Sequence, residues 1–114
     1  MNKIYSMLGL ASKAGRLVSG EDIVRNSIRK NKVKLMIISE DASENTKKRF
    51  LNAAEFYKVP VVIWGQKEVL GSSIGKSDRS VVGICDVGFQ KNISLLLSDL
   101  ASNPGNKSGG EPNE

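Results

Sequence analysis

The sequence predicts an α/β protein: a three-layer α/β/α sandwich in which a small mixed sheet lies between two layers of helices. Two observations support this prediction. The first is that apolar runs such as Leu35–Ile38 and Val61–Trp64 contain no polar residue at every second position. The second is that segments with helical periodicity lie between these runs along the chain. Such strands need cover on both faces, and the intervening helices can supply it. The 114 residues are enough for one domain with one core.

The first third of the chain predicts two amphipathic helices joined by a very short strand. Apolar residues at helical spacing indicate a helix over residues 2–14, which Gly15 ends. Leu17 and Val18 predict the strand, and Gly20 opens the second helix, whose expected end is Asn31. The buried stripe of that helix is expected to consist of Ile23, Val24, Ser27 and Ile28.

Further strands and helices follow the Leu35–Ile38 strand. A helix is predicted over 43–57, capped by Asp41 or Ser43, and Pro60 introduces the next strand. The remaining elements are a short helix over 68–73, a strand over 81–85 and a helix over 89–100. The side chains expected to face inward from these helices are Phe50, Leu51, Ala54, Tyr57, Ile93, Leu96, Leu97 and Leu100. Residues 1–101 are expected to form the single domain and residues 102–114, which lack large apolar side chains, a disordered tail.

Composition excludes several classes of function. The chain has one cysteine, Cys85, and no histidine, which excludes a disulfide framework, cysteine-rich zinc sites, Ser-His triads and Cys-His dyads. No apolar run is long enough for a membrane span, and the N-terminus lacks a signal-peptide cleavage site. We therefore expect a cytoplasmic protein without a membrane partner, cofactor or metal, and we expect it not to be an enzyme.

The positive charge is concentrated in the first third of the chain. The net charge is +5, and residues 1–34 contain eight Lys or Arg against two Asp or Glu, whereas the remainder has nine basic and ten acidic residues. A basic segment of this kind is typical of nucleic-acid binding. A solvated helix face that only aids solubility explains the charge alone about as well.

Three other features have a structural and a functional interpretation. Gly71–Ser77 is similar to a phosphate-binding loop, but it has one residue too few between its glycines and leads into a strand, which favours a simple turn. Adjacent carboxylates at Glu40 and Asp41 could act in acid-base chemistry, but helix capping explains them more simply. Trp64 could stack an unpaired base, although packing in the core is the more common role.

A longer pattern resembles a known family. Gly20 opening a helix, then the run Ile28–Asp41, then Val59-Pro60-Val61 and Val81–Ile84 resemble the ribosomal protein family that includes archaeal L7Ae and L30e. Leu8–Ala11 and Ala14–Gly20 are similar to its bacterial YlxQ subgroup. The resemblance covers about residues 4–100 and implies the same sandwich fold and RNA binding, typically to kink-turns, in which a helix start reads sheared G·A pairs.

The kink-turn motif itself is altered in this chain. Family members that bind kink-turns carry Gly, any residue, Asn, Glu, two residues and Lys, where this chain has Gly20, Asp22, Ile23 and Asn26 at the defined positions. Asp cannot donate as Asn does, Ile cannot accept from a guanine edge, and Asn26 lacks the Lys cation. The altered motif therefore counts against kink-turn specificity, whereas general affinity for RNA phosphates is less affected.

We therefore expect a non-enzymatic protein of the translation apparatus that binds ribosomal RNA and contacts ribosomal or other translation proteins. Backbone N–H groups after Gly20 would meet a phosphate or a base edge, and basic loops would close on the RNA backbone. The residues expected at the RNA site are Gly20, Glu21, Asp22, Arg25, Asn26, Arg29, Lys32, Glu40, Asp41, Lys67, Lys76 and Arg79. The alternatives are a small nucleotide-binding domain using the Gly71–Ser77 loop and a protein-interaction module.

Overall fold

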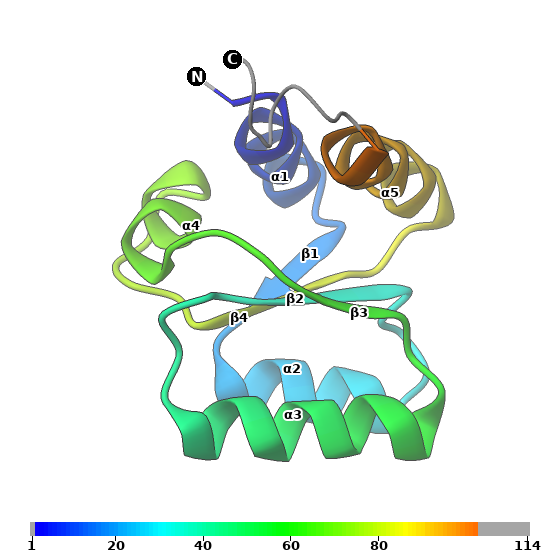
Figure 1. The fold of residues 1–114 in the computed structure, drawn as a ribbon. Helices are drawn as coiled ribbons and strands as arrows, with labels where there is room; N and C mark the ends of the chain where they lie inside the picture. The colour runs from blue at the N-terminus through cyan, green and yellow to red at the C-terminus, as the bar shows by residue number, and fades with distance from the viewer. Residues whose placement is uncertain (1, 103–114) are drawn as a thin grey trace.

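The computed structural model describes residues 2–102 of the chain. Its helices and strands follow the order that the sequence predicts (Figure 1). The ends differ from the predicted ones by at most two residues, as expected where helix ends fray. The elements are α1 (Lys3–Lys13), β1 (Leu17–Ser19), α2 (Glu21–Arg29), β2 (Leu35–Ile38), α3 (Glu44–Tyr57), β3 (Val61–Ile63), α4 (Lys67–Ser73), β4 (Val81–Ile84) and α5 (Val87–Ser102).

The four strands form one mixed sheet in the order β1-β4-β2-β3. β4 pairs antiparallel with both β1 and β2, and β2 pairs parallel with β3. Helices α1, α4 and α5 lie on one face of the sheet, and α2 and α3 lie on the other (Figure 1). The predicted three-layer α/β/α sandwich with a small mixed sheet is therefore confirmed.

Two hydrophobic clusters lie on the two faces of the sheet. Along β2 the side chains alternate between them: Leu35 and Ile37 belong to the cluster with α1 and α5, Met36 and Ile38 to the cluster with α2 and α3. All four are buried, which explains why β2 shows no polar alternation in the sequence. Trp64 is half-buried against the first cluster, as its structural interpretation predicts.

Three apolar side chains predicted to face inward are exposed instead. Ile23 is 57% exposed, Leu51 38% and Leu100 41%. Ile23 and Leu51 each lie about 100° around the helix from the neighbour that is buried, Val24 and Phe50 respectively. The predicted apolar face of each helix was therefore one residue too wide and included side chains that point away from the sheet.

The strand β3 also differs from its prediction. It lies at the edge of the sheet and is only partly buried, with Ile63 41% exposed. An apolar run indicates that helices cover the faces of a strand, but it does not indicate whether the strand lies in the middle of the sheet or at its edge. The expected tail lies outside the described residues, apart from residue 102 at the end of α5. No helix in the described part of the chain is long and apolar enough to span a membrane.

Candidate nucleic-acid interface

One end of the sheet collects most of the segments in which the sequence predicts functional residues. β1, β2 and β3 run in one direction and β4 in the other, so three strand exits meet the entrance to β4. We call this end the strand-end edge; it comprises residues 20–22, 39–41, 64–68 and 75–80, on the left of Figure 1. Backbone hydrogen bonds join its loops, from Ser39 N to Ser80 O at 2.8 Å and from Glu40 N to Gly65 O at 2.7 Å.

A hollow of about 410 Å³ opens at this edge between the start of α2 and the α4–β4 loop. Gly20, which precedes α2, has φ = 93°, a backbone conformation that favours glycine. Its N–H donates to Val81 O at 3.1 Å, and no side chain caps the first turn of α2. The N–H groups of that turn are therefore available to a ligand that enters the hollow.

Arg79 lines the same hollow and is held in place by its neighbours. Its Nε donates to Ser19 Oγ at 3.2 Å, and its Nη1 donates to Ser77 Oγ at 3.1 Å and to Asp78 O at 3.0 Å. The guanidinium therefore sits beside the start of α2 with little freedom to move. A cation fixed in this way loses little conformational entropy when an anion binds.

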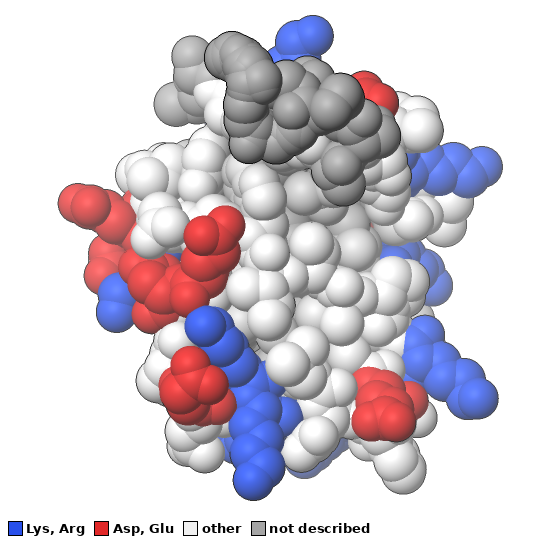
Figure 2. Space-filling view, viewed as in Figure 1, with Lys and Arg blue, Asp and Glu red and all other residues white. Residues whose placement is uncertain are grey.

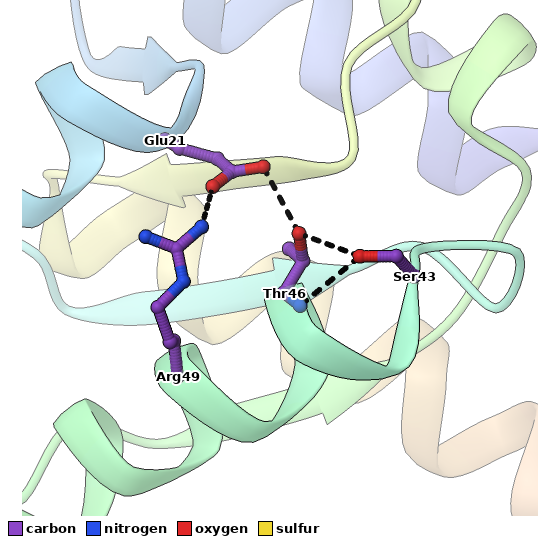
Figure 3. Close-up of polar contacts among 4 residues, drawn as sticks. All are labelled: Glu21, Ser43, Thr46 and Arg49. Carbon is purple, nitrogen blue, oxygen red and sulfur yellow. Dashed lines mark hydrogen bonds and ion pairs between the residues drawn. The ribbon is translucent and has the colours of Figure 1, made fainter.

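Glu21 also lines the hollow, and its carboxylate joins two helices (Figure 3). Its Oε1 pairs with Arg49 of α3, and its Oε2 accepts a hydrogen bond from Thr46 Oγ1 at 3.1 Å. Thr46 is in turn bound by Ser43, whose Oγ accepts from Thr46 N at 3.1 Å and so caps α3. The Glu21 carboxylate is thus engaged in holding α2 to α3.

Asp41 caps α4 rather than α3. Its Oδ1 accepts a hydrogen bond from Lys67 N at 2.9 Å, across the strand-end edge. This bond is the main reason why the pKa of the Asp41 carboxyl lies below its ordinary value. Of the two capping residues that the sequence leaves open for α3, Ser43 is the one that serves it. The neighbouring Glu40 is exposed.

The Gly71–Ser77 segment is a tight turn whose N–H groups are already occupied. Gly75 N donates to Ser72 O at 3.1 Å, and Lys76 N donates to Gly71 O at 2.8 Å. A phosphate-binding loop needs such N–H groups free to surround the phosphates. The turn interpretation is therefore the one that fits this geometry.

The basic residues of this edge differ in exposure. The side chain of Lys67 is half-buried and that of Lys76 is exposed, and neither forms an ion pair within the described residues. Lys67 O accepts a hydrogen bond from Arg79 N at 3.0 Å, which places these two residues side by side. Lys67 and Arg79 thus lie together at this edge, and Arg79 also lies beside the start of α2.

Other predicted RNA-contacting residues lie farther away. Arg25 and Asn26 occupy the second turn of α2, Arg29 its last residue, and Lys32 the loop beyond. Nine helical residues span about 13 Å, so Arg29 and Lys32 reach the opposite end of the sheet. The structure does not bring these two residues to the strand-end edge.

The strand-end edge is more acidic than basic. Figure 2 shows acidic side chains gathered on the left, the side on which Figure 1 places this edge. In the four segments that form it, the carboxylates are Glu21, Asp22, Glu40, Asp41, Glu68 and Asp78, against the cations Lys67, Lys76 and Arg79. The expectation of a cationic site here is wrong. The reason is that α2 runs away from this edge, so the basic residues at its end and beyond it lie at the other end of the sheet.

Four residues of the hollow were not among the predicted site residues: Ser19, Ile23, Asp78 and Ser80. Asp78 is the neighbour of the predicted Arg79 in the sequence. Ser19 and Ser80 line it because β1 and β4 are neighbours, a pairing of distant segments for which the sequence holds no signal. Ile23 also lines it, although the helical pattern placed Ile23 in the core. The only sequence signal for the exposure of Ile23 is its position at the border of the apolar stripe, beside the buried Val24.

The chain is similar to several known proteins. A profile described as the ribosomal protein L7Ae/L30e/S12e/Gadd45 family matches residues 2–94. The RNA-binding protein YlxQ of Bacillus subtilis (strain 168) is 47% identical over 93 residues, 82% of this chain and 93% of that protein. Large ribosomal subunit protein eL8 of Thermoplasma volcanium is 31% identical over 101 residues, 88% of this chain and 82% of that protein. The solved structure of a protein with unknown function from Bacillus halodurans C has a TM-score of 0.82 at 38% identity and covers 86% of this chain and 99% of its own. These matches confirm the resemblance seen in the sequence: the chain belongs to the ribosomal protein L7Ae/L30e/S12e/Gadd45 family.

Proposed function

We propose that this protein binds structured RNA, that the hollow at the strand-end edge contacts one phosphate or base edge of it, and that the protein catalyses no reaction. The observation that carries the proposal is the hollow in which the uncapped first turn of α2 lies beside the fixed guanidinium of Arg79. Backbone N–H groups and an arginine fork are both suited to phosphate oxygens and to base edges. The relative named RNA-binding protein YlxQ supports RNA as the ligand.

Ribosomal RNA is the class of RNA that we propose. Its support is the likeness to a protein named large ribosomal subunit protein eL8. Ribosomal or other translation proteins are proposed as further partners on the same ground. The proposal does not include kink-turn specificity, because Ile23 presents an exposed apolar side chain where the kink-turn motif has Glu.

The test measures the affinity of the protein for purified ribosomal RNA at several salt concentrations. We expect Arg79→Ala and Lys67→Ala each to weaken binding and to reduce the salt slope by about one unit, since each removes one phosphate contact. Lys91→Ala is the matched control, because this exposed lysine on α5 carries the same charge and lies away from the hollow.

Arg79 also fastens its loop to β1, so the folding of each variant is checked by urea unfolding. The Lys67 side chain donates no hydrogen bond within the described residues, and Lys67→Ala keeps the test valid if Arg79→Ala is destabilised. Binding by both variants equal to that of Lys91→Ala at every salt concentration would remove the hollow from the RNA site. Binding to unrelated RNA as strong as that to ribosomal RNA would remove the proposed RNA class.

A further inference from the structure

A second concave surface lies at the opposite end of the strands and is lined by cations. This cleft has a volume of about 510 Å³ and lies between the end of α2, the α1–β1 turn and the end of β4. No Asp or Glu lines it. We call it the basic cleft; the lining residues that matter here are Arg16, Ser27, Asn31, Lys32, Lys34 and Cys85.

The sheet register brings two of these cations together. Leu17 of β1 and Leu35 of β2 both lie opposite Ile84 of β4, so Arg16 and Lys34 flank Cys85 one residue farther along. Backbone hydrogen bonds fix this arrangement: Cys85 N donates to Arg16 O at 2.8 Å, and Lys34 N donates to Ile84 O at 2.7 Å. The two cations therefore come from segments that are far apart in the sequence.

The turn after α2 supplies the third cation. Asn31 adopts a left-handed conformation with φ = 59°, and Lys32 N then donates to Ser27 O at 3.0 Å, which folds the chain back over the end of the helix. Burial raises the pKa of the Cys85 thiol, and the positive charges of Lys32 and Lys34 offset part of this effect. Both ammonium groups therefore lie close enough to act on the one thiol.

The charges of Arg16, Lys32 and Lys34 are not neutralised by a carboxylate within the described residues. Lys34 Nζ donates to Asn31 O at 3.3 Å, but none of the three cations forms an ion pair in the described part of the chain. The nearest acidic residue in the sequence, Asp86, has its Oδ2 engaged with Phe89 N at the start of α5. Further basic side chains extend the surface at the ends of α1 and α2: Lys13, Arg29 and Lys30, all exposed.

We propose that the basic cleft is a second RNA-binding surface, which takes the phosphodiester backbone without reading base sequence. This inference rests on the proposed function and assigns it a second site. The lining has cations and the polar side chains of Ser27 and Asn31 for phosphate and 2′-hydroxyl oxygens, but no aromatic ring on which a base could stack. Because the cleft and the hollow lie at opposite ends of the strands, one chain can contact two segments of RNA.

Cys85 provides a direct test in the unaltered protein, since it is the only cysteine in the chain. The rate at which iodoacetamide alkylates Cys85 is measured with and without a fully paired RNA hairpin. We expect the RNA to slow alkylation several-fold, because a backbone in the cleft covers the half-buried thiol. An unchanged rate at RNA concentrations that saturate binding would overturn the proposal.

Charge variants give the second measurement. The triple variant Arg16→Gln, Lys32→Gln, Lys34→Gln removes the cleft cations, and Lys3→Gln, Lys48→Gln, Lys91→Gln is the control with the same change in net charge and no residue in the cleft. We expect the cleft variant to reduce the salt slope of hairpin binding by about three units. Equal slopes in the two variants would contradict the proposal.

The same assays separate this inference from the proposed function. In the Lys67→Ala variant, RNA should still protect Cys85 if the cleft acts by itself. Weakened binding in Lys67→Ala together with an unprotected Cys85 in the wild type would retain the strand-end edge as an RNA site and reject the cleft. The reverse pattern would retain the cleft and reject the strand-end edge. Protection by poly-glutamate but not by RNA would assign the cleft to an acidic protein and overturn the proposal.

Discussion

Two glycines near the end of α4 are required for different physical reasons. A Cβ at Gly71 would lie 1.8 Å from Ser77 O, so the loop that leads to Arg79 packs directly on this backbone. Gly75 has open space around it but adopts φ = 75°. The first position therefore depends on close approach, and the second on a backbone conformation that side chains disfavour.

Alanine substitutions should separate these two requirements. We expect Gly71→Ala to lower the free energy of unfolding by about 3 kcal/mol, since backbone must move to admit the methyl group. Gly75→Ala should cost only about 1–2 kcal/mol, which is the strain of the left-handed conformation. Urea unfolding measures both values. Gly75→Asn should recover part of the loss, and equal costs at the two glycines would contradict the packing argument.

From the sequence alone, Glu21 could contact a ligand at the start of α2 or bind another helix. In the sequence it stands in the first turn of α2, next to the glycine that opens the helix. In the structure its carboxylate binds Thr46 and Arg49, which lie 25 and 28 residues away. Only the contact between α2 and α3 determines that this carboxylate binds two residues of another helix.

Among the elements, α4 depends on a cap from outside itself. Gln66, at its N-cap position, makes no side-chain cap, and Asp41 from the β2–α3 turn binds the Lys67 N–H instead. This bond ties the β2–α3 turn to the segment that carries Lys67. The geometry of the strand-end edge is therefore coupled to the ionisation of one carboxyl group.

The Asp41 cap predicts a stability difference that depends on pH. The folded state holds the pKa of Asp41 below its ordinary value of 3.8, so its stabilisation is present above pH 3.8 and is lost as the pH falls through the folded-state pKa. We expect Asp41→Asn to be less stable than the wild type at pH 7. The difference should shrink as the pH falls below about 4. Thermal unfolding at several pH values measures it, and a constant difference would contradict this role for the carboxylate.

Over the whole molecule, the sheet separates two cores. Ile4 of α1 belongs to the cluster on one face and Ile28 of α2 to the cluster on the other, and both are almost fully buried. Substitutions that remove one methylene from each cluster alter different contacts. Their effects on stability should therefore be independent.

Two conservative substitutions test this separation. Ile4→Val and Ile28→Val should each lower the free energy of unfolding by about 0.5–1.5 kcal/mol, and the double variant should show the sum within about 0.5 kcal/mol. Urea unfolding of the three variants gives the comparison. A larger deviation from additivity would mean that the sheet transmits changes from one core to the other.

The charge of the molecule is also arranged at this scale. The surplus of basic residues lies in the first third of the sequence, yet the fold divides that third between both ends of the sheet. Gly20 and the start of α2 reach the strand-end edge, whereas Arg16 and Lys32 reach the basic cleft. A single RNA site built from all of the basic residues is therefore incompatible with the direction of α2.

The sequence by itself determined the order of helices and strands, the buried character of β2 and the family. These properties depend on periodicity, glycine and proline positions and short motifs, which act among near neighbours in the chain. They were sufficient to locate Gly20, Lys67 and Arg79 in segments that meet in the structure. Positions at the borders of apolar stripes, such as Ile23, were predicted wrongly, because local periodicity does not define how wide the buried face of a helix is.

Only the tertiary structure decided which distant segments became neighbours. The strand order β1-β4-β2-β3 brings Ser19 beside Arg79, which lies 60 residues away, and brings Arg16 and Lys34 to either side of Cys85. Such pairings depend on how the whole chain buries its apolar surface on the two faces of one sheet, and no local pattern records that outcome. The physical reason is that charges take their positions from the packing of the elements that carry them.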